Sequence, residues 1–295
     1  MTAGTTGLAT AYLEPEIAVM LWTADEPVSM AGVFAPMGKA LPTEGGYTLN
    51  GRWPFGSGAG HSTWLMLGGL VLSGAAEKPE LAAFFVHHED VTTHDTWHVS
   101  GLRGTGSNDL SVCDVFVPAE RVVSLTTGSP QSEGRLFRFP IFGLLACGVA
   151  AVGLGIARAS IDEFFAQNCS GVRPSRAAND SLVQVAVAEA EGRVRAARAY
   201  LFAELERIWL LAEGPLEPIQ AADIRLAALH AVQASVAAVD AIYYASGGSA
   251  IYEKNRQERH FRDIHVVQQH IMVSPRASKL VARVLMGIET DTSQL

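Results

Sequence analysis

One stretch of the sequence combines flat aromatic side chains, a hydroxyl and several glycines. Residues 45–64 open with a Gly-Gly turn, continue as alternating strand residues and then place Trp53, Phe55 and Ser57 two positions apart among glycines. An aromatic ring can stack on a planar ligand while a hydroxyl and uncovered backbone N–H groups bind its polar edge. The pattern fits a site for a planar cofactor. It also fits a bulged strand whose aromatic residues fill a core, since glycine within a strand often marks a bulge.

Arg103 lies in a second glycine-rich stretch, Gly101 to Ser107. Its guanidinium could bind a cofactor phosphate, bind a substrate anion or simply hold the loop in place. A phosphate-binding glycine loop usually leads directly into the N-terminus of a helix, where backbone N–H groups point at the anion. No helical pattern follows this loop directly, so the stretch is a weak phosphate motif.

Histidines supply the titratable side chains. His270 suits acid–base chemistry because an imidazole titrates near neutral pH, although a neighbour could also satisfy it in a structural role. His265 lies five residues earlier on the same expected helix, about 140° away, so the two are not expected to share a metal ion. His94 and His98 can share a strand face, but without a carboxylate or cysteine cluster they are interpreted as surface residues.

The elements that must position these side chains change type along the chain. Short strand-like segments bounded by turn residues occupy 30–34, 47–53, 64–72, 81–87, 91–99 and 111–117. Long alanine-rich segments of helical period then cover 140–167, 177–211, 216–245 and 264–287. The sequence predicts an α+β fold, in which an antiparallel β-sandwich or barrel domain is followed by a C-terminal four-helix bundle.

Domain boundaries follow from the same patterns. Residues 1–28 are expected to be a short lead, irregular over 2–7 and helical within 9–22. The β domain is expected over 29–130 and the helical bundle over 131–295, after a Gly-Ser-Pro linker.

Composition narrows the class of partner. The 295 residues carry a net charge of −8 and show no Lys/Arg cluster, which argues against nucleic acid or an anionic membrane and favours a small molecule. The three cysteines are widely spaced, with no CxxC pair, so no metal site is expected. The N-terminal residues resemble no targeting signal, and a cytoplasmic location is the default expectation.

Four stretches together resemble the acyl-CoA dehydrogenase superfamily, over about residues 15–290. They are the run Trp53-Pro-Phe-Gly-Ser-Gly, the run Gly101 to Ser107 with Asp114 to Pro118, the turn Gly247 to Tyr252, and Arg259 to His265 leading to His270. The first run and the terminal histidine are closer to the two-component flavin-dependent monooxygenases than to the members that oxidise acyl-CoA. Those members use a catalytic glutamate, for which the helical half offers no convincing candidate.

The resemblance implies roles for individual residues. Phe55 and Ser57 match positions that lie against the flavin ring and contact its N5/O4 edge, with Trp53 beside them, and His270 matches a histidine near the reacting oxygen and the substrate. The catalytic residues implied are Ser57 and His270. The remaining implied cofactor contacts are the backbone of Gly247 and Gly248, and a phosphate-binding arginine at Arg173 or Arg176, with Arg103 as a further candidate.

The implied activity is oxygenation of a small aromatic or other electron-rich substrate, using O2 and reduced FMN or FAD from a separate flavin reductase. A homodimer or homotetramer assembled through the bundle is expected, without a metal. Members of the superfamily carry a helical domain ahead of the β domain, whereas here only residues 8–22 precede the strands. We therefore expect a shortened form, a natural truncation or one half of a split enzyme whose partner chain supplies that domain.

Two alternatives stay open at this point. The chain could be a catalytically silent or cofactor-free scaffold of the same fold, for which the short N-terminal region is the main support. It could also be a flavoenzyme of the acyl-CoA dehydrogenase type, which the missing glutamate disfavours.

Overall fold

The computed structural model describes residues 2–23, 28–72, 79–171 and 175–295. The chain forms two compact units, which are described separately. The first, here called the β unit, contains Met1–Val99 and Arg103–Phe137. The second, the helical unit, contains Arg138–Leu295 together with Ser100–Leu102, a short piece of the loop that precedes the last long strand.

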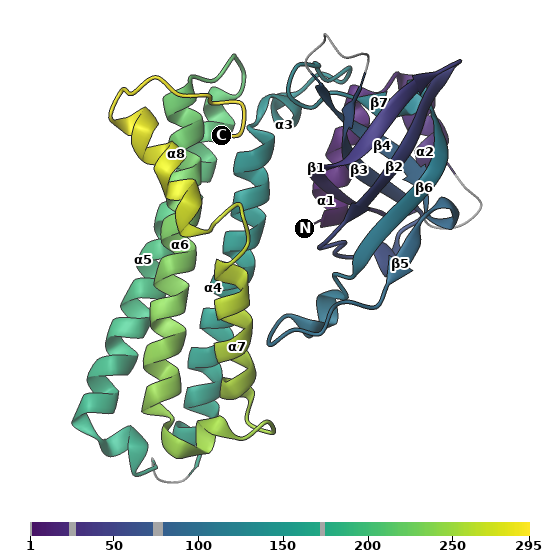
Figure 1. Ribbon diagram of the computed structural model, residues 1–295. Helices are drawn as coiled ribbons and strands as arrows, with labels where there is room; N and C mark the ends of the chain where they lie inside the picture. Colours follow the sequence, from purple (N-terminus) through teal and green to yellow (C-terminus); the bar gives the residue numbers. More distant parts are fainter. Residues whose placement is uncertain (1, 24–27, 73–78, 172–174) are drawn as a thin grey trace. The chain divides into compact units, whose positions relative to one another are not determined.

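A single mixed sheet forms the β unit (Figure 1). Its strands are β1 (Met30–Thr43), β2 (Gly46–Trp53), β3 (Trp64–Val71), β4 (Glu80–His87), β5 (Thr92–His94), β6 (Asp109–Pro118) and β7 (Val122–Val123). The order across the sheet is β5-β6-β2-β1-β3-β4-β7. All neighbours are antiparallel except β1 and β3, which are parallel. The expectation of a wholly antiparallel sandwich or barrel is therefore corrected to one mixed sheet.

The sheet is strongly curved, so that strands without mutual backbone hydrogen bonds face each other. Tyr47 on β2 meets Phe84 on β4 edge-to-face at 5.9 Å between ring centroids, although β1 and β3 lie between those strands. Trp53 is fully buried in the concave core, where its indole N–H donates to the Gly68 carbonyl at 2.7 Å. The concave face thus encloses a hydrophobic core of its own.

Two glycines that face each other make room for the Trp53 indole. Gly38 on β1 is the register partner of Gly51 on β2. A Cβ at Gly38 would lie 2.5 Å from the indole, and one at Gly51 would lie 2.6 Å from it. Because those distances are far below van der Waals contact, only glycine fits at either position. The glycines around Trp53 therefore serve packing at this point of the sheet.

The opposite face of the sheet is covered by the N-terminal helices α1 (Thr2–Ala9) and α2 (Pro15–Trp22). Leu13 and Leu21 pack there with Met66 and Phe85 in a second core, while the alternate strand residue Phe84 enters the concave core. Successive side chains of a strand point to opposite faces of the sheet, so the same strands contribute residues to both cores. Residues 2–7, expected to be irregular, belong to α1 instead.

Long helices build the helical unit. They are α4 (Ile141–Cys169), α5 (Ser181–Leu211), α6 (Pro218–Ala245), α7 (Arg256–Gln268) and α8 (Pro275–Leu285), preceded by the short α3 (Arg135–Arg138). α6 packs against α4, α5, α7 and α8 and lies at the centre of the unit. Its buried face is rich in alanine, whose small side chain lets neighbouring helices approach closely.

Side-chain caps and a proline set where the helices begin. The Asp180 carboxylate accepts the Leu182 N–H at 2.8 Å and so caps α5, and Asn255 caps α7 in the same way. A single helix is expected over 264–287, but the structure has α7 and α8 separated by a turn, with Pro275 in the first turn of α8. Proline lacks the N–H that a continuous helix needs, so it favours a new start.

Two of the helices, α4 and α6, are long and apolar enough to cross a membrane by length and composition. Core helices of a helical domain meet the same test. Apolar residues of both helices contribute to one shared core.

Candidate functional site

Two loops of the β unit meet beside the end of β2. The backbone N–H of Gly56, in the loop after β2, donates to the Asn108 carbonyl at 3.0 Å. The Asn108 side-chain oxygen in turn accepts the backbone N–H groups of Thr96 at 3.1 Å and Trp97 at 2.9 Å. One asparagine therefore ties together the loop after β2, the segment before β6 and the segment after β5.

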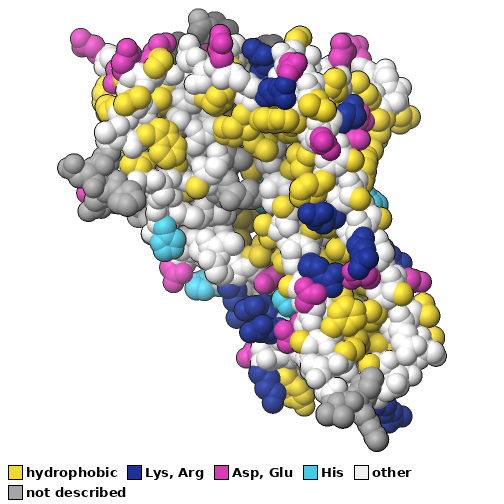
Figure 2. All heavy atoms as spheres, turned by 180° about the vertical axis from the view of Figure 1, so that it is seen from behind, with side chains coloured by type: hydrophobic (Ala, Val, Ile, Leu, Met, Phe, Trp, Pro, Cys, Tyr) yellow, Lys and Arg dark blue, Asp and Glu magenta, His cyan; other side chains and the backbone are white. Residues whose placement is uncertain are grey.

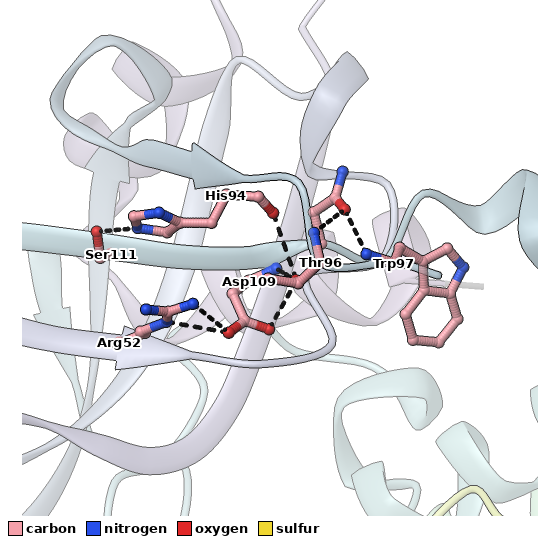
Figure 3. A network of polar contacts seen from close by, with 7 residues as sticks. Arg52, His94, Thr96, Trp97, Asp109 and Ser111 are labelled. Atoms are coloured by element: carbon pink, nitrogen blue, oxygen red, sulfur yellow. Dashed lines mark hydrogen bonds and ion pairs between the residues drawn. The ribbon is translucent and has the colours of Figure 1, made fainter. Parts of the chain in front are cut away.

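Polar contacts on the adjoining strands hold the same region (Figure 3). Arg52 and Asp109 form an ion pair at 2.9 Å, and Asp109 exchanges two hydrogen bonds with Thr96. His94 bonds to the Ser111 hydroxyl at 2.8 Å, which gives this histidine a structural partner. In Figure 3 the Trp97 indole points away from this network. The network thus supports the segment that carries the indole.

Phe55 is presented in an unusual way. Its backbone has φ 66°, in the left-handed region that costs a non-glycine residue about 1 kcal/mol or more. Its side chain is 65% exposed and meets Trp97 edge-to-face with 6.1 Å between ring centroids. Burial of the ring does not offset this strain, and strained backbone conformations cluster at active sites and ligand-binding loops.

Ser57 begins a row of three hydroxyl groups. Its Oγ lies 2.6 Å from Ser107 Oγ, which lies 2.7 Å from Thr105 Oγ1. Ser107 is 3% exposed, whereas Thr105 is exposed. The residues matched to a flavin contact, Phe55 and Ser57, are therefore together at the loop, while the ring of Trp53 belongs to the concave core and does not join them at the surface.

Arg103 lies at an open hollow in the β unit. The hollow has a volume of about 430 Å³ and is lined by Trp97, His98, Val99 and Arg103. The Nε of Arg103 donates to the Val99 carbonyl at 2.9 Å, so the guanidinium helps to fix its own loop. The structure thus supports the loop-holding role directly and places the side chain at a depression that a ligand could enter.

His270 lies in the turn after α7, which ends at Gln268, and not within a helix as expected. Its Nδ1 accepts the backbone N–H of Met272 at 3.3 Å. A neutral imidazole bonded in this way carries its proton on Nε2, which becomes a donor. Burial, and secondly the charge of Arg225, lowers the pKa of His270 below its ordinary value, so the neutral form dominates at neutral pH.

Arg225, on α6, was not singled out from the sequence. It is only 4% exposed, and its Nη1 contacts the carbonyls of Phe142 at 3.4 Å and Gln294 at 3.2 Å and the sulfur of Met272 at 3.5 Å. Within the described part of the chain it forms no ion pair, and its buried Nε has no hydrogen-bond partner. Because burial removes the guanidinium from water and so disfavours its charged form, the pKa of Arg225 is lowered from its ordinary value.

The predicted glycine turn lies far from His270 along the helical unit. Gly247 and Gly248 open the short 3-10 helix η7 (Gly247–Ile251) after α6, and Gly247 has φ 63°. A Cβ at either glycine would meet nothing within 4 Å, so their backbone is uncovered. α7 separates this turn from His270 by about 20 Å at 1.5 Å per residue. The predicted Arg173 lies outside the described residues.

A contact between a histidine and a carboxylate in the helical unit was also not predicted from the sequence. His265 Nε2 lies 3.0 Å from the carboxylate of Asp240 on α6. Phe261 packs between this pair and Tyr243, edge-to-face with His265 at 4.6 Å and stacked on Tyr243 at 4.3 Å. Among the described residues no group of three or more His, Cys, Asp or Glu side chains could hold a metal ion.

Comparison with known proteins gives a consistent result. The family model of the acyl-CoA dehydrogenase C-terminal domain matches residues 147–275. The flavin-dependent monooxygenase oxygenase subunit HsaA of Rhodococcus jostii is 30% identical over 271 residues, which cover 86% of this chain and 70% of that protein. The oxygenase component of the FADH(2)-dependent resorcinol hydroxylase of Rhizobium sp. is 30% identical over 292 residues, covering 91% of this chain and 71% of that protein.

A solved structure agrees with these relatives. The crystal structure of the 3-HSA hydroxylase from Rhodococcus sp. RHA1 superposes with a TM-score of 0.91 at 27% sequence identity. The superposition covers 99% of this chain and 79% of that one.

Proposed function

The chain belongs to the two-component flavin-dependent monooxygenases of the acyl-CoA dehydrogenase superfamily, and we propose that it uses reduced FMN or FAD and O2 to hydroxylate a small aromatic substrate. It is therefore an oxidoreductase, and its flavin is supplied in reduced form by a separate reductase. The single observation that carries the assignment to the β-unit site is Phe55, whose exposed ring stands on a strained backbone beside Ser57.

The residues of the β unit fit a flavin. A flavin offers a flat ring and a polar edge, and the loop offers the exposed Phe55 ring and the Ser57 hydroxyl on neighbouring positions. Arg103 and the Trp97 ring border the adjacent hollow, which suits an aromatic or anionic portion of a ligand. Phe55, Ser57 and Arg103 are the cofactor contacts that we propose in the β unit. Gly247 and Gly248 are a separate proposal for the helical unit, which rests on the family resemblance and on their exposed backbone.

Once bound, the flavin supplies the oxygen chemistry, and the chain orients the reactants and manages protons. Ser57 holds the polar edge of the ring. His270 holds its proton on Nε2, because Met272 N–H occupies Nδ1. A neutral imidazole in this tautomer donates a hydrogen bond to an oxygen atom, and it can give up that proton or take one at a later step.

The name of one relative supports an aromatic substrate, because that protein is a hydroxylase of resorcinol, a phenol. A reduced flavin together with O2 would supply an electrophilic oxygen atom, which reacts most readily with an electron-rich ring. We propose a phenol or comparable small aromatic compound as the substrate class.

We further propose that α4 to α8 form a four-helix bundle in which α7 and α8 together make the fourth helix, and that two or four copies assemble through it. Large hydrophobic side chains are exposed along α5, namely Leu182, Val185, Phe202, Trp209, Leu210 and Leu211. Figure 2 shows exposed hydrophobic side chains on the surface, interspersed with basic and acidic side chains. Such exposed area on a helix favours a partner. A cytoplasmic location remains part of this proposal.

An anaerobic titration tests the proposed function. The purified chain is titrated with reduced FMN and with reduced FAD, and binding is followed by flavin absorbance and fluorescence. We expect binding of at least one of them, weakened in Phe55→Ala. Absence of binding by both flavins would instead favour a cofactor-free scaffold, and reduction of bound oxidised flavin by an acyl-CoA would favour a dehydrogenase.

A further inference from the structure

Met272 connects His270 to the interior of the helical unit. Its backbone N–H donates to Nδ1 of His270 at 3.3 Å, and its sulfur lies 3.5 Å from Nη1 of Arg225. Both contacts belong to one residue, so the side-chain contact restrains the residue whose N–H the imidazole accepts. Arg225 therefore bears on the position of His270 through Met272.

The same guanidinium contacts two further segments of the helical unit. Its Nη1 lies 3.4 Å from the carbonyl of Phe142, in the first turn of α4, and 3.2 Å from the carbonyl of Gln294, after α8. Arg225 itself belongs to α6. One side chain thus holds the turn that carries His270 against α6, the start of α4 and the residues after α8.

Stability alone gives little reason for an arginine at this place. The side chain is 4% exposed, its Nε has no hydrogen-bond partner, and among the described residues it forms no ion pair. Arginine stays protonated in proteins, so its charge is held in the interior beside carbonyl groups and a thioether. A buried charge without a counter-charge is unfavourable, and departures of this kind are expected mainly at functional sites.

No acid among the described residues offsets the charge of Arg225 beside His270. On α6 the charge that bears on His270 is that of Arg225 itself. On α4 the titratable neighbour is Cys147, and burial raises the pKa of its thiol to about 12, so the thiol is uncharged at neutral pH. Residues 269–274 contain no titratable side chain besides His270. A positive charge near an imidazole opposes the addition of a second proton.

We propose that Arg225 is a positioning residue for His270: it anchors Met272, which keeps the ring proton on Nε2, and its charge keeps a second proton off Nδ1. The proposal rests on the proposed function, in which His270 offers the Nε2 proton to an oxygen atom. A doubly protonated ring would lose the hydrogen bond from Met272 and would place a second positive charge beside the first. Arg225 thereby preserves the neutral donor form of His270 in mildly acidic solution.

Arg225→Met removes the charge and the N–H donors but keeps an unbranched side chain in the core. His270 should then titrate at a higher pH than in the wild type, and still below an ordinary histidine because burial remains. The ratio of the Nε2–H to the Nδ1–H tautomer should fall about fivefold, which corresponds to the loss of one ordinary hydrogen bond.

Two further variants separate the charge from the packing. Arg225→Lys keeps a cation, so His270 should titrate close to the wild type. Arg193→Met is the matched control, because it removes an arginine on α5 whose side chain is 46% exposed and pairs with Glu189. That variant should change neither the titration nor the tautomer ratio of His270.

Nitrogen NMR of the full chain, labelled with ¹⁵N-histidine, measures both properties without any flavin. Spectra recorded from pH 5 to pH 8 give the titration of each ring and show which ring nitrogen carries the proton. His270→Asn identifies the signal of His270 by its absence. His260 is an internal reference, because the charges that act on it are those of other residues, and its titration should be the same in every variant.

A second measurement links the ring to the reaction. The rate of hydroxylation by the chain loaded with reduced flavin is followed over the same pH range. In Arg225→Met the loss of rate on the acid side should begin at a higher pH than in the wild type, and Arg225→Lys should restore the wild-type profile.

Four results would overturn the proposal, and each has its own meaning. Wild-type His270 that titrates at or above about 6.5, or that carries its proton on Nδ1, would overturn it without any variant. If His270 behaves alike in the wild type and in Arg225→Met, then Arg225 only packs the helices together and the proposed function stands. If the ring responds but the acid side of the rate profile does not move, Arg225 has no part in the reaction. If the wild type binds neither reduced flavin, the proposed function itself fails, whatever the NMR spectra show.

Discussion

The backbone N–H of Leu102 donates to the Asp263 carboxylate at 2.7 Å, across 161 residues of sequence. Leu102 has φ 52°, a left-handed conformation that a leucine adopts only when its surroundings enforce it. Arg262, the preceding residue on α7, donates to the Ser100 carbonyl and pairs with Glu258 on its own helix. α7 therefore clamps the segment Ser100–Leu102 as part of the helical unit.

Asp263→Ala should destabilise the chain by about 1–3 kcal/mol, because it leaves a strained loop N–H without its charged acceptor. The helix expected over 264–287 begins earlier in the structure, at Arg256, so Asp263 lies within α7 and its carboxylate accepts the Leu102 N–H. Urea unfolding checks the value. Asp95→Ala, which removes an 87% exposed carboxylate, is the control and should change stability by less than about 0.5 kcal/mol. Equal effects would mean that the clamp contributes nothing.

The stability of the chain should fall as the pH drops below about 6.5, the ordinary pKa of histidine. The pKa of His270 is lowered in the folded state by burial and by Arg225, and that of His260 by burial and by Arg259. The unfolded chain therefore binds protons that the folded chain resists, so stability is complete above 6.5 and is lost toward the lower folded pKa.

His270→Asn isolates the share of this residue, since asparagine does not titrate and can still accept the Met272 N–H. Urea unfolding from pH 8 to pH 5 should show a smaller loss of stability in the variant than in the wild type. His260 contributes to the loss that remains. A variant profile identical to that of the wild type would show that His270 has an ordinary pKa in the folded chain.

Two of the three cysteine thiols should react with a thiol reagent in the native chain. Cys113 and Cys169 are exposed, whereas Cys147 is buried in the core of the helical unit. Burial also raises the pKa of the Cys147 thiol to about 12, which removes the reactive thiolate at neutral pH. Titration at pH 7.5 should count two thiols without denaturant and three with it. A native count of three would contradict the packing of α4 against α6.

Phe55→Gly should separate stability from ligand binding. Glycine relieves the positive φ at little cost in buried area, so the unfolding free energy should be unchanged or about 1 kcal/mol higher, while flavin binding should weaken. Phe116→Gly is the matched control, because Phe116 is a 52% exposed phenylalanine on β6. That variant should lose stability and keep flavin binding. Loss of stability in Phe55→Gly would mean that the ring serves packing.

Local sequence patterns predicted much of the secondary structure. Alternation located most strands to within a few residues, and alanine-rich periodicity located α4, α5 and α6. The parallel pairing of β1 with β3 could not be read from short apolar runs, because nothing local encodes which strands become neighbours. The break between α7 and α8 had a local signal in Pro275, which the longer periodic pattern outweighed.

In the candidate site, too, local motifs could be recognised in the sequence, whereas contacts between distant segments could not. The motif containing Phe55 and Ser57 could be recognised in sequence, but the burial of Trp53 depends on the paired glycines of two strands. The contact between Ser57 and Ser107 depends on how two loops meet. Arg225 gave no signal, because a lone arginine in an apolar helix is indistinguishable from a surface residue until its neighbours are known.

The most direct test of the assigned activity is a single turnover with labelled oxygen. The chain is loaded anaerobically with reduced FAD or FMN, given a panel of phenols, and mixed with ¹⁸O2, and the products are analysed by mass spectrometry. We predict that one ¹⁸O atom enters a phenol, and that the Ser57→Ala and His270→Ala variants shift the consumed oxygen toward hydrogen peroxide. Release of all the oxygen as hydrogen peroxide by the wild type, with every phenol in a broad panel unlabelled, would contradict the monooxygenase assignment.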